Sequence, residues 1–228
     1  METVAEKLGI VYNSPNVRSW KDEGHFVIPD VAYRGQTGTY RLFEQMTPAM
    51  NQAQTAVIYE IEKQKGNPYP TDAPLIWAII TRGYVIKNQN PEASEKLRQF
   101  LGQGFRRYPG TLTRIAYEPS EKDKIIHNYK TSDEYSIDTE VVGPDDFVQN
   151  ISDKKVLESL LGTQDIARIN EVSQWVNGTN GYLWRSNSKP EKKEERVARF
   201  DAYDDRFILY CNWSPHLVCP AFRVLKVE

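Results

Sequence analysis

The chain has 228 residues, of which 39% are hydrophobic and 26% are charged, and its net charge is -2 at pH 7. These values are typical of a globular protein with a core of its own, and the absence of a basic footprint argues against nucleic acid as the main partner. The longest apolar run, residues 75–80, is too short for a membrane span.

The first part of the chain is expected to begin with loops. Residues 1–36 are interpreted as extended and loop-like, because short β-branched pieces are broken by Pro29 and Gly35. The first 13 residues contain no basic segment followed by an apolar one, so we expect no signal peptide. This indicates a cytoplasmic protein or a component of a virion.

Three helices are expected between residues 40 and 104. Apolar residues recur at spacings of three and four over residues 40–65, which predicts a helix that Pro48 kinks or divides. After a turn-rich connector, residues 74–88 are expected to form a buried helix followed by a short strand. Residues 91–104 read as a helix with Pro91 at its start and glycines at its end.

The second half is expected to contain two more helices and most of the strands. Residues 105–150 carry many β-formers and are interpreted as strands or long loops, and helices are expected over 151–162 and 163–181. A charged, solvated loop is expected at 189–195, among strands at 181–186, 196–203, 206–213 and 220–227. The order predicts one α+β domain over residues 1–228, with helices in the N-terminal part and short antiparallel strands in the C-terminal part.

Motifs that carry chemistry are scarce. His25, His127 and His216 lie far apart without metal-ligand spacing, and no phosphate-binding or dinucleotide-binding motif is present. We therefore predict no metal and no cofactor. Cys211 and Cys219 are interpreted as two small buried thiols, although they could pair if the chain folds back between them.

The composition of the tail is biased. Residues 203–218 contain no Lys, Glu, Gln or Met, although the chain has 15 Lys, 18 Glu, 11 Gln and 3 Met. Long flexible side chains lose the most entropy when they are ordered in a contact, whereas Tyr, Trp, Asn, Ser and His give contact area or hydrogen bonds at lower cost. The depletion fits a binding surface, and composition alone fits a buried strand pair equally well.

A family resemblance favours the binding surface. The tail carries LWRSNSKP at residues 183–190, ERVARFDA at 195–202 and PAFRV at 220–224. These segments resemble the variable region of diversity-generating retroelement variable proteins of archaea and their viruses. That family often has a glycine after the phenylalanine of the last segment, where this chain continues directly into Arg223. In that family a reverse transcriptase that misreads adenines diversifies such regions, and AAC or AAT codons then never yield Lys, Glu, Gln, Met or Trp. Trp213 departs from this scheme, although an AGG codon could give Trp through one adenine change.

The resemblance implies a C-type lectin-like fold of the formylglycine-generating-enzyme-like subgroup, with a variable region at residues 184–224. It also implies a set of diversified, ligand-binding residues: Tyr203, Asp204, Phe207, Ile208, Tyr210, Asn212, Trp213, Ser214, His216, Leu217, Val218 and Cys219. The implied fixed scaffold comprises Trp184, Arg185, Val197, Phe200, Leu209, Pro220, Ala221, Phe222 and Val224. Alternation along residues 207–213 would pack one face and display the other, and the sequence leaves open which face is which.

Three functions compete at this stage. The first is a non-enzymatic display protein that binds a variable protein or cell-surface target through the tail. The second is an oxidase-like enzyme of the formylglycine-generating fold that uses Cys211 and Cys219. The third is a virion structural protein without a ligand, in which the tail aromatics belong to the core.

Overall fold

The structure is a computed structural model that describes residues 11–13 and 23–227. The expectations for residues 1–10 and 14–22, including the segment tested for a signal peptide, lie outside the described residues. Two β-sheets and five α-helices are formed within the described part, so the predicted α+β class is confirmed.

The smaller sheet joins the two ends of the chain. Its strand order is β1-β2-β3-β12-β4. The strands are β1 (Val11–Asn13), β2 (His25–Tyr33), β3 (Gln36–Phe43), β4 (Tyr69–Pro70) and β12 (Arg223–Val227). Antiparallel pairing places Val224 of β12 opposite Leu42 of β3, so a strand near the C-terminus lies between β3 and the short edge strand β4 in a sheet built from the N-terminal part.

The larger sheet carries the tail. Its strand order is β7-β6-β5-β10-β11-β9-β8. The strands are β5 (Gly110–Tyr117), β6 (Asp123–His127), β7 (Tyr135–Thr139), β8 (Asp146–Phe147), β9 (Gly181–Trp184), β10 (Glu194–Ala202) and β11 (Phe207–Trp213). Strands β9 and β11 are parallel, unlike the antiparallel arrangement expected for the tail.

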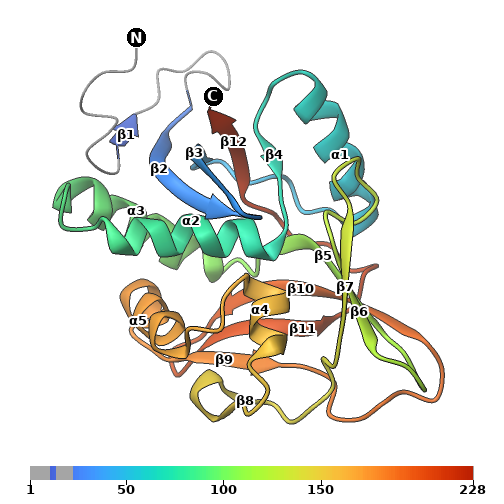
Figure 1. Ribbon diagram of the computed structural model, residues 1–228. Coiled ribbons are helices and arrows are strands. Elements are labelled where there is room, and N and C mark those ends of the chain that lie inside the picture. Colours follow the sequence, from blue (N-terminus) through green and yellow to red (C-terminus); the bar gives the residue numbers. More distant parts are fainter. Residues whose placement is uncertain (1–10, 14–22, 228) are drawn as a thin grey trace.

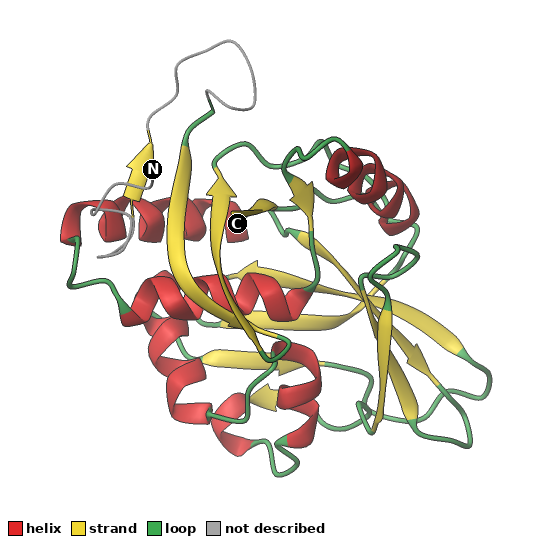
Figure 2. Cartoon of the chain, turned by 45° about the horizontal axis from the view of Figure 1, so that its top comes forward, coloured by secondary structure: helices red, strands yellow, loops and turns green. Residues whose placement is uncertain are grey.

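The helices are α1 (Gln52–Gln64), α2 (Ala73–Val85), α3 (Pro91–Phe105), α4 (Lys155–Leu161) and α5 (Ile166–Asn177), with a short 3-10 helix, η3 (Val148–Asn150). Helices α2 and α3 lie between the sheets, α4 and α5 lie over one face of the larger sheet, and α1 lies to the side, next to β4 (Figure 1). Helix α2 contacts β2 of the smaller sheet as well as α4 and α5 (Figure 2). One core cluster accordingly contains Leu42 of β3, Ile79 of α2 and Phe200 of β10.

Several expected boundaries were wrong. Residues 25–33 form strand β2 rather than a loop, and Tyr40–Phe43 of the expected first helix belong to β3. Helix α1 begins only after Asn51, whose side chain accepts a hydrogen bond from Gln54 N in a capping box. The short strand expected directly after α2 is absent, because residues 86–90 form turns. Glu194 and Glu195 belong to β10 rather than to the charged loop.

The remaining helices match the expectation in type and position. Asn90 caps α3 and Asp165 caps α5, each by accepting a hydrogen bond from a backbone N–H in the first turn. Gly162 and Gly178 end α4 and α5 in the left-handed conformation, at φ 75 and 74°. Helices α1, α2 and α3 lie in the N-terminal half and strands β9 to β12 follow residue 180, as predicted, but β2 and β3 precede the first helix and β9 pairs with β11 in parallel, so the predicted division holds only in part. Nowhere in residues 11–13 and 23–227 is there a helix with the length and apolarity needed to cross a bilayer.

Candidate functional site

Strand β10 separates the core from an outer face of the larger sheet. Ala198, Phe200 and Ala202 belong to the core cluster. Because successive side chains of a strand point to opposite faces, Arg199 and Asp201 lie on the other face. Both are nevertheless buried, at 6% and 0% exposure. Other side chains must therefore cover this polar pair.

Strand β11 resolves which face of the tail is packed. Phe207, Leu209 and Cys211 belong to the core cluster, whereas Tyr210 and Asn212 point the other way and are partly exposed. The expectation that Phe207 is displayed was therefore wrong. It was also wrong for Ile208, which is only 2% exposed although it faces away from the core cluster. Ile208 lies between Asp201 of β10 and Tyr182 of β9 in the outer layer.

The other ten expected ligand-binding residues retain accessible area. The side chains of Tyr203, Leu217 and Val218 are exposed at 42%, 49% and 57%. The remaining members divide into the exposed Asp204 and His216 and the partly exposed Tyr210, Asn212, Trp213, Ser214 and Cys219. Most of the expected set therefore lies at the surface.

Aromatic rings surround Arg199 on the outer face. The Arg199 guanidinium carbon lies 3.4 Å from the Trp213 ring centroid, 5.0 Å from that of Tyr210 and 5.2 Å from that of Tyr108. Cation–π attraction of this kind strengthens when the cation is removed from water. The rings of Tyr108, Tyr210 and Trp213 thus cover the cation, and their outer sides face the solvent.

Further rings extend this layer in both directions. Tyr203 lies 6.1 Å from Tyr108, and Trp184 lies 5.2 Å from Tyr210, between ring centroids. Leu217 and Trp213 line one small cavity, which connects the following loop to the rings. We call the set formed by Tyr108, Trp184, Tyr203, Tyr210, Trp213 and Leu217 the tail surface.

A buried ion pair supports the tail surface from below. Arg199 Nη2 donates a hydrogen bond of 2.9 Å to Asp201 Oδ2. Burial raises the pKa of Asp201 to about 6, and the neighbouring Arg199 only partly opposes this rise. Within the described residues, Arg199 Nε, Asp201 Oδ1 and Trp213 Nε1 are buried without a hydrogen-bond partner. Such atoms are uncommon in folded proteins, so three in one layer mark an unusual site.

A charged hollow of about 530 Å³ adjoins this face. Ser214, Pro215 and His216 line it from the loop after β11. The opposite wall is polar and comprises Asn51, Arg114, Tyr129, Lys130, Lys193, Glu194, Glu195 and Arg196. Arg196 Nε also donates a 2.8 Å hydrogen bond to Asn212 Oδ1. The tail thus offers an apolar aromatic area beside a hydrophilic one.

Four residues of this site were not predicted from the sequence as binding residues. Trp184 was expected to be scaffold, yet it is 37% exposed and belongs to the tail surface. Tyr108 lies far away in the sequence, and only its position before β5 brings it to Tyr203. Arg199 and Asp201 could have been found, because they alternate with apolar residues in the segment ARFDA. The other expected scaffold residues are buried or partly buried.

The two cysteines are free thiols in different settings. Cys211 lies in the core, whereas Cys219 is partly exposed and forms an isolated β-bridge with Met50. Burial raises the pKa of both thiols. A nucleophilic or redox-active cysteine requires the opposite shift.

The groups available at the site are aromatic rings, one buried ion pair and a charged hollow. In the part of the chain that the structure describes, no group of three or more His, Cys, Asp and Glu side chains is placed to hold a metal ion. The tail surface instead offers rigid aromatic side chains, which suit a contact area. No protein-family model, curated protein or solved structure matches this chain.

Proposed function

We propose that the chain is a non-enzymatic ligand-binding protein that recognises a protein or cell-surface target through its tail surface. We further propose that it is a diversity-generating retroelement variable protein with a C-type lectin-like fold of the formylglycine-generating-enzyme-like subgroup. The resemblance of residues 183–224 motivates the family. The pairing of β12 with β3 supports it, because the family places a terminal strand in a core sheet.

One observation carries the binding function. Tyr203, Tyr210, Trp213 and Leu217 retain accessible area on a strand and loops whose other side packs into the core. Aromatic side chains on a rigid support lose little entropy on binding, so they supply much of the affinity of a protein interface. The adjoining charged hollow would receive polar or acidic groups of the same target.

A pair of displayed libraries tests this function. In the first, Tyr203, Tyr210, His216, Leu217 and Val218 are randomised. In the matched control, five exposed positions of α3 are randomised: Glu92, Glu95, Lys96, Gln99 and Gln103. Both libraries are selected against the same folded protein, hen egg-white lysozyme.

The tail library is expected to yield folded binders with dissociation constants below about 1 µM, and the α3 library is expected to yield markedly fewer. Equal yields from both libraries, or a tail library that does not fold, would contradict the proposal. The family assignment has its own test. The codons for residues 184–224 should have a near-copy beside a reverse transcriptase gene, with differences concentrated at adenines.

The oxidase-like alternative lacks a supporting observation. It requires a lowered thiol pKa at Cys211 or Cys219, whereas burial raises both. Alkylation of Cys219 by iodoacetamide at pH 7 is therefore expected to be slower than that of free cysteine. A virion protein without a ligand would leave the exposed rings of the tail surface unused.

A further inference from the structure

A second cavity lies on the opposite side of the larger sheet from the tail surface. Its volume is about 450 Å³, and β2, α2, β7 and α4 enclose it. Trp77 forms part of its wall and also packs against Phe200 and Phe207, on the inner face of the sheet. We call this cavity the hairpin pocket, because the tip of the β2–β3 hairpin forms its rim.

The wall of the hairpin pocket is largely apolar. Its apolar members come from four elements and are Ala32, Pro74, Ala78, Val85, Ile137 and Leu161. A cavity of this size and lining is typical of a site for a small organic molecule. Polar groups in such a site set the chemical class of the ligand.

The charges around the pocket leave one cation without an anionic partner. Arg34, Arg82 and Arg168 line the pocket together with Asp30 and Glu158. Arg82 forms an ion pair with Asp30 at 2.9 Å, and Arg168 forms one with Glu171 at 3.2 Å. Arg34 forms no ion pair with any residue that the structure describes. Its guanidinium carbon lies 4.1 Å from the Tyr135 ring centroid.

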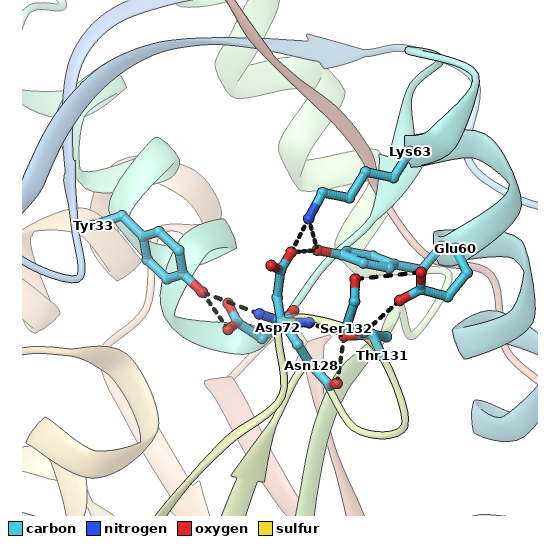
Figure 3. Close-up of polar contacts among 9 residues, drawn as sticks. Tyr33, Glu60, Lys63, Asp72, Asn128, Thr131 and Ser132 are labelled. Atoms are coloured by element: carbon cyan, nitrogen blue, oxygen red, sulfur yellow. Dashed lines mark hydrogen bonds and ion pairs between the residues drawn. The ribbon is translucent and has the colours of Figure 1, made fainter.

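The nearest buried acid does not neutralise Arg34 through an ion pair. Asp72 caps α2, where its Oδ1 accepts a 3.0 Å hydrogen bond from Leu75 N. Its Oδ2 accepts a 2.6 Å hydrogen bond from the Tyr33 hydroxyl, and Figure 3 shows Tyr33 pointing at it. Asp72 is therefore held by α2 and Tyr33. Arg34 is the cation of the pocket without an ion pair among the described residues, and Glu158, which accepts a hydrogen bond of 2.5 Å from Gln164, is the acid that shares the lining with it.

The histidine of the pocket is also fully engaged. His127 Nδ1 lies 2.9 Å from the Thr113 hydroxyl, and Nε2 lies 2.8 Å from the Ser159 carbonyl. The Ser159 carbonyl can only accept, so Nε2 carries the proton, and burial lowers the pKa of His127 and favours the neutral ring, in which Nδ1 accepts from the Thr113 hydroxyl. His127 thus holds its proton on Nε2 and is a structural residue. The lining residues Trp77 and Thr81 keep polar atoms, Nε1 and Oγ1, that are buried without a hydrogen-bond partner among the described residues, and Arg34 supplies the positive charge.

The backbone at Arg34 is in the left-handed region, which it shares with Asp30, Tyr108, Asn128 and Lys130 among the non-glycine residues that the structure describes. Arg34 and Gly35 have φ angles of 51° and 71°, as a two-residue hairpin turn of type I′ requires. Asn, Asp and Gly are the usual residues at such positions, and another side chain there costs of order 1 kcal/mol. An arginine in this strained position is explained if its guanidinium is needed at the rim.

We propose that the hairpin pocket binds a small organic anion with an apolar body, such as a medium-chain or aromatic carboxylate. The carboxylate pairs with the Arg34 guanidinium in a bidentate contact, and the chain or ring fills the apolar interior. This site is separate from the tail surface.

Isothermal titration calorimetry with octanoate and 3-phenylpropanoate tests the proposal, with 1-octanol and 3-phenylpropanol as uncharged counterparts. Arg34→Asn removes the cation and keeps a residue suited to the turn, so the fold is preserved. Ala78→Trp fills the interior. Arg107→Asn, on an exposed residue outside the pocket, is the matched control.

At least one of the two anions is expected to bind the unaltered chain about tenfold or more tightly than its alcohol. Arg34→Asn should abolish this preference, Ala78→Trp should abolish binding of both forms, and Arg107→Asn should change neither. Near-ultraviolet circular dichroism verifies that each variant is folded. The proposal is overturned if neither anion binds, if the alcohols bind equally well, or if folded Arg34→Asn retains the preference.

Discussion

Single residues in strand β10 decide how the tail is presented. Arg199 and Asp201 are buried although they face away from the core, because the rings of the tail surface cover them. A buried ion pair contributes little net stability, but it fixes the geometry of the groups around it when its hydrogen bonds are well placed. Alternation in the sequence could predict that these two residues share a face. It could not predict Tyr108, since that contact joins segments far apart in the chain.

The raised pKa of Asp201 makes stability depend on pH. Its pKa is about 6 in the folded chain, against about 3.9 in an unfolded one. The folded state therefore holds the proton more tightly, so this contribution to stability is fully present below about pH 4. It is lost as pH rises to about 6, by about 3 kcal/mol.

Asp201→Asn should remove this loss. Urea unfolding at pH 4 and pH 7 measures how much the free energy of unfolding falls for the unaltered chain and for Asp201→Asn. The difference between these two falls is the contribution of Asp201. Identical changes in both proteins would show that Asp201 titrates normally.

At the scale of elements, capping residues identified where helices begin and end. Apolar spacing was misleading where a strand and a loop happened to have the spacing of a helix. The apolar residues of β3 and of the loop before α1 imitate a helical spacing, which extended the expected first helix back to residue 40. The capping pair Asn51 and Gln54 was the better signal for its start. The glycines of α3 were expected to end that helix, yet it continues through Gly104 to Phe105.

Gly104 allows the Phe222 ring to approach α3. An added Cβ would lie 2.7 Å from the ring, too close for an unshifted structure. Gly104→Ala should therefore destabilise the chain by about 1–3 kcal/mol through overpacking, although alanine is the better helix former. At Gly102, an added Cβ would come no closer than 3.3 Å to the Val176 carbonyl oxygen, so Gly102→Ala is the matched control.

A double-mutant cycle with Phe222→Leu tests whether the Phe222 ring causes the destabilisation by Gly104→Ala. The cost of Gly104→Ala, measured by urea unfolding, should shrink when the ring is absent. An unchanged cost in the Phe222→Leu background would place the strain elsewhere in α3.

For the whole molecule, the sequence predicted the α+β class but not the topology. The pairing of β12 with β3, the parallel β9–β11 pair and the strand orders depend on contacts between distant segments, which local patterns do not encode. The C-type lectin-like fold stays a prediction. The exposure of the tail was predicted in part, because the family resemblance, and not the composition alone, indicated exposed residues but failed for the buried Phe207 and Ile208.

One core cluster includes both sheets and α2, so the chain should unfold as a unit. Tryptophan fluorescence and far-ultraviolet circular dichroism are expected to give superimposable urea transitions. Trp77 lies in the core, whereas Trp184 and Trp213 belong to the tail surface, so fluorescence samples both regions. Two separated transitions would indicate that the sheets are independent folding units.

The position of β12 between β3 and β4 also determines when the smaller sheet can form during synthesis. Strands β3 and β4 leave the ribosome long before residues 223–227 are translated, so the gap between them stays open while the tail is made. Until then the edge of β3 that pairs with β12 has no partner within the chain, and such an open edge can pair with other polypeptides. The smaller sheet is therefore completed only after the tail has been translated.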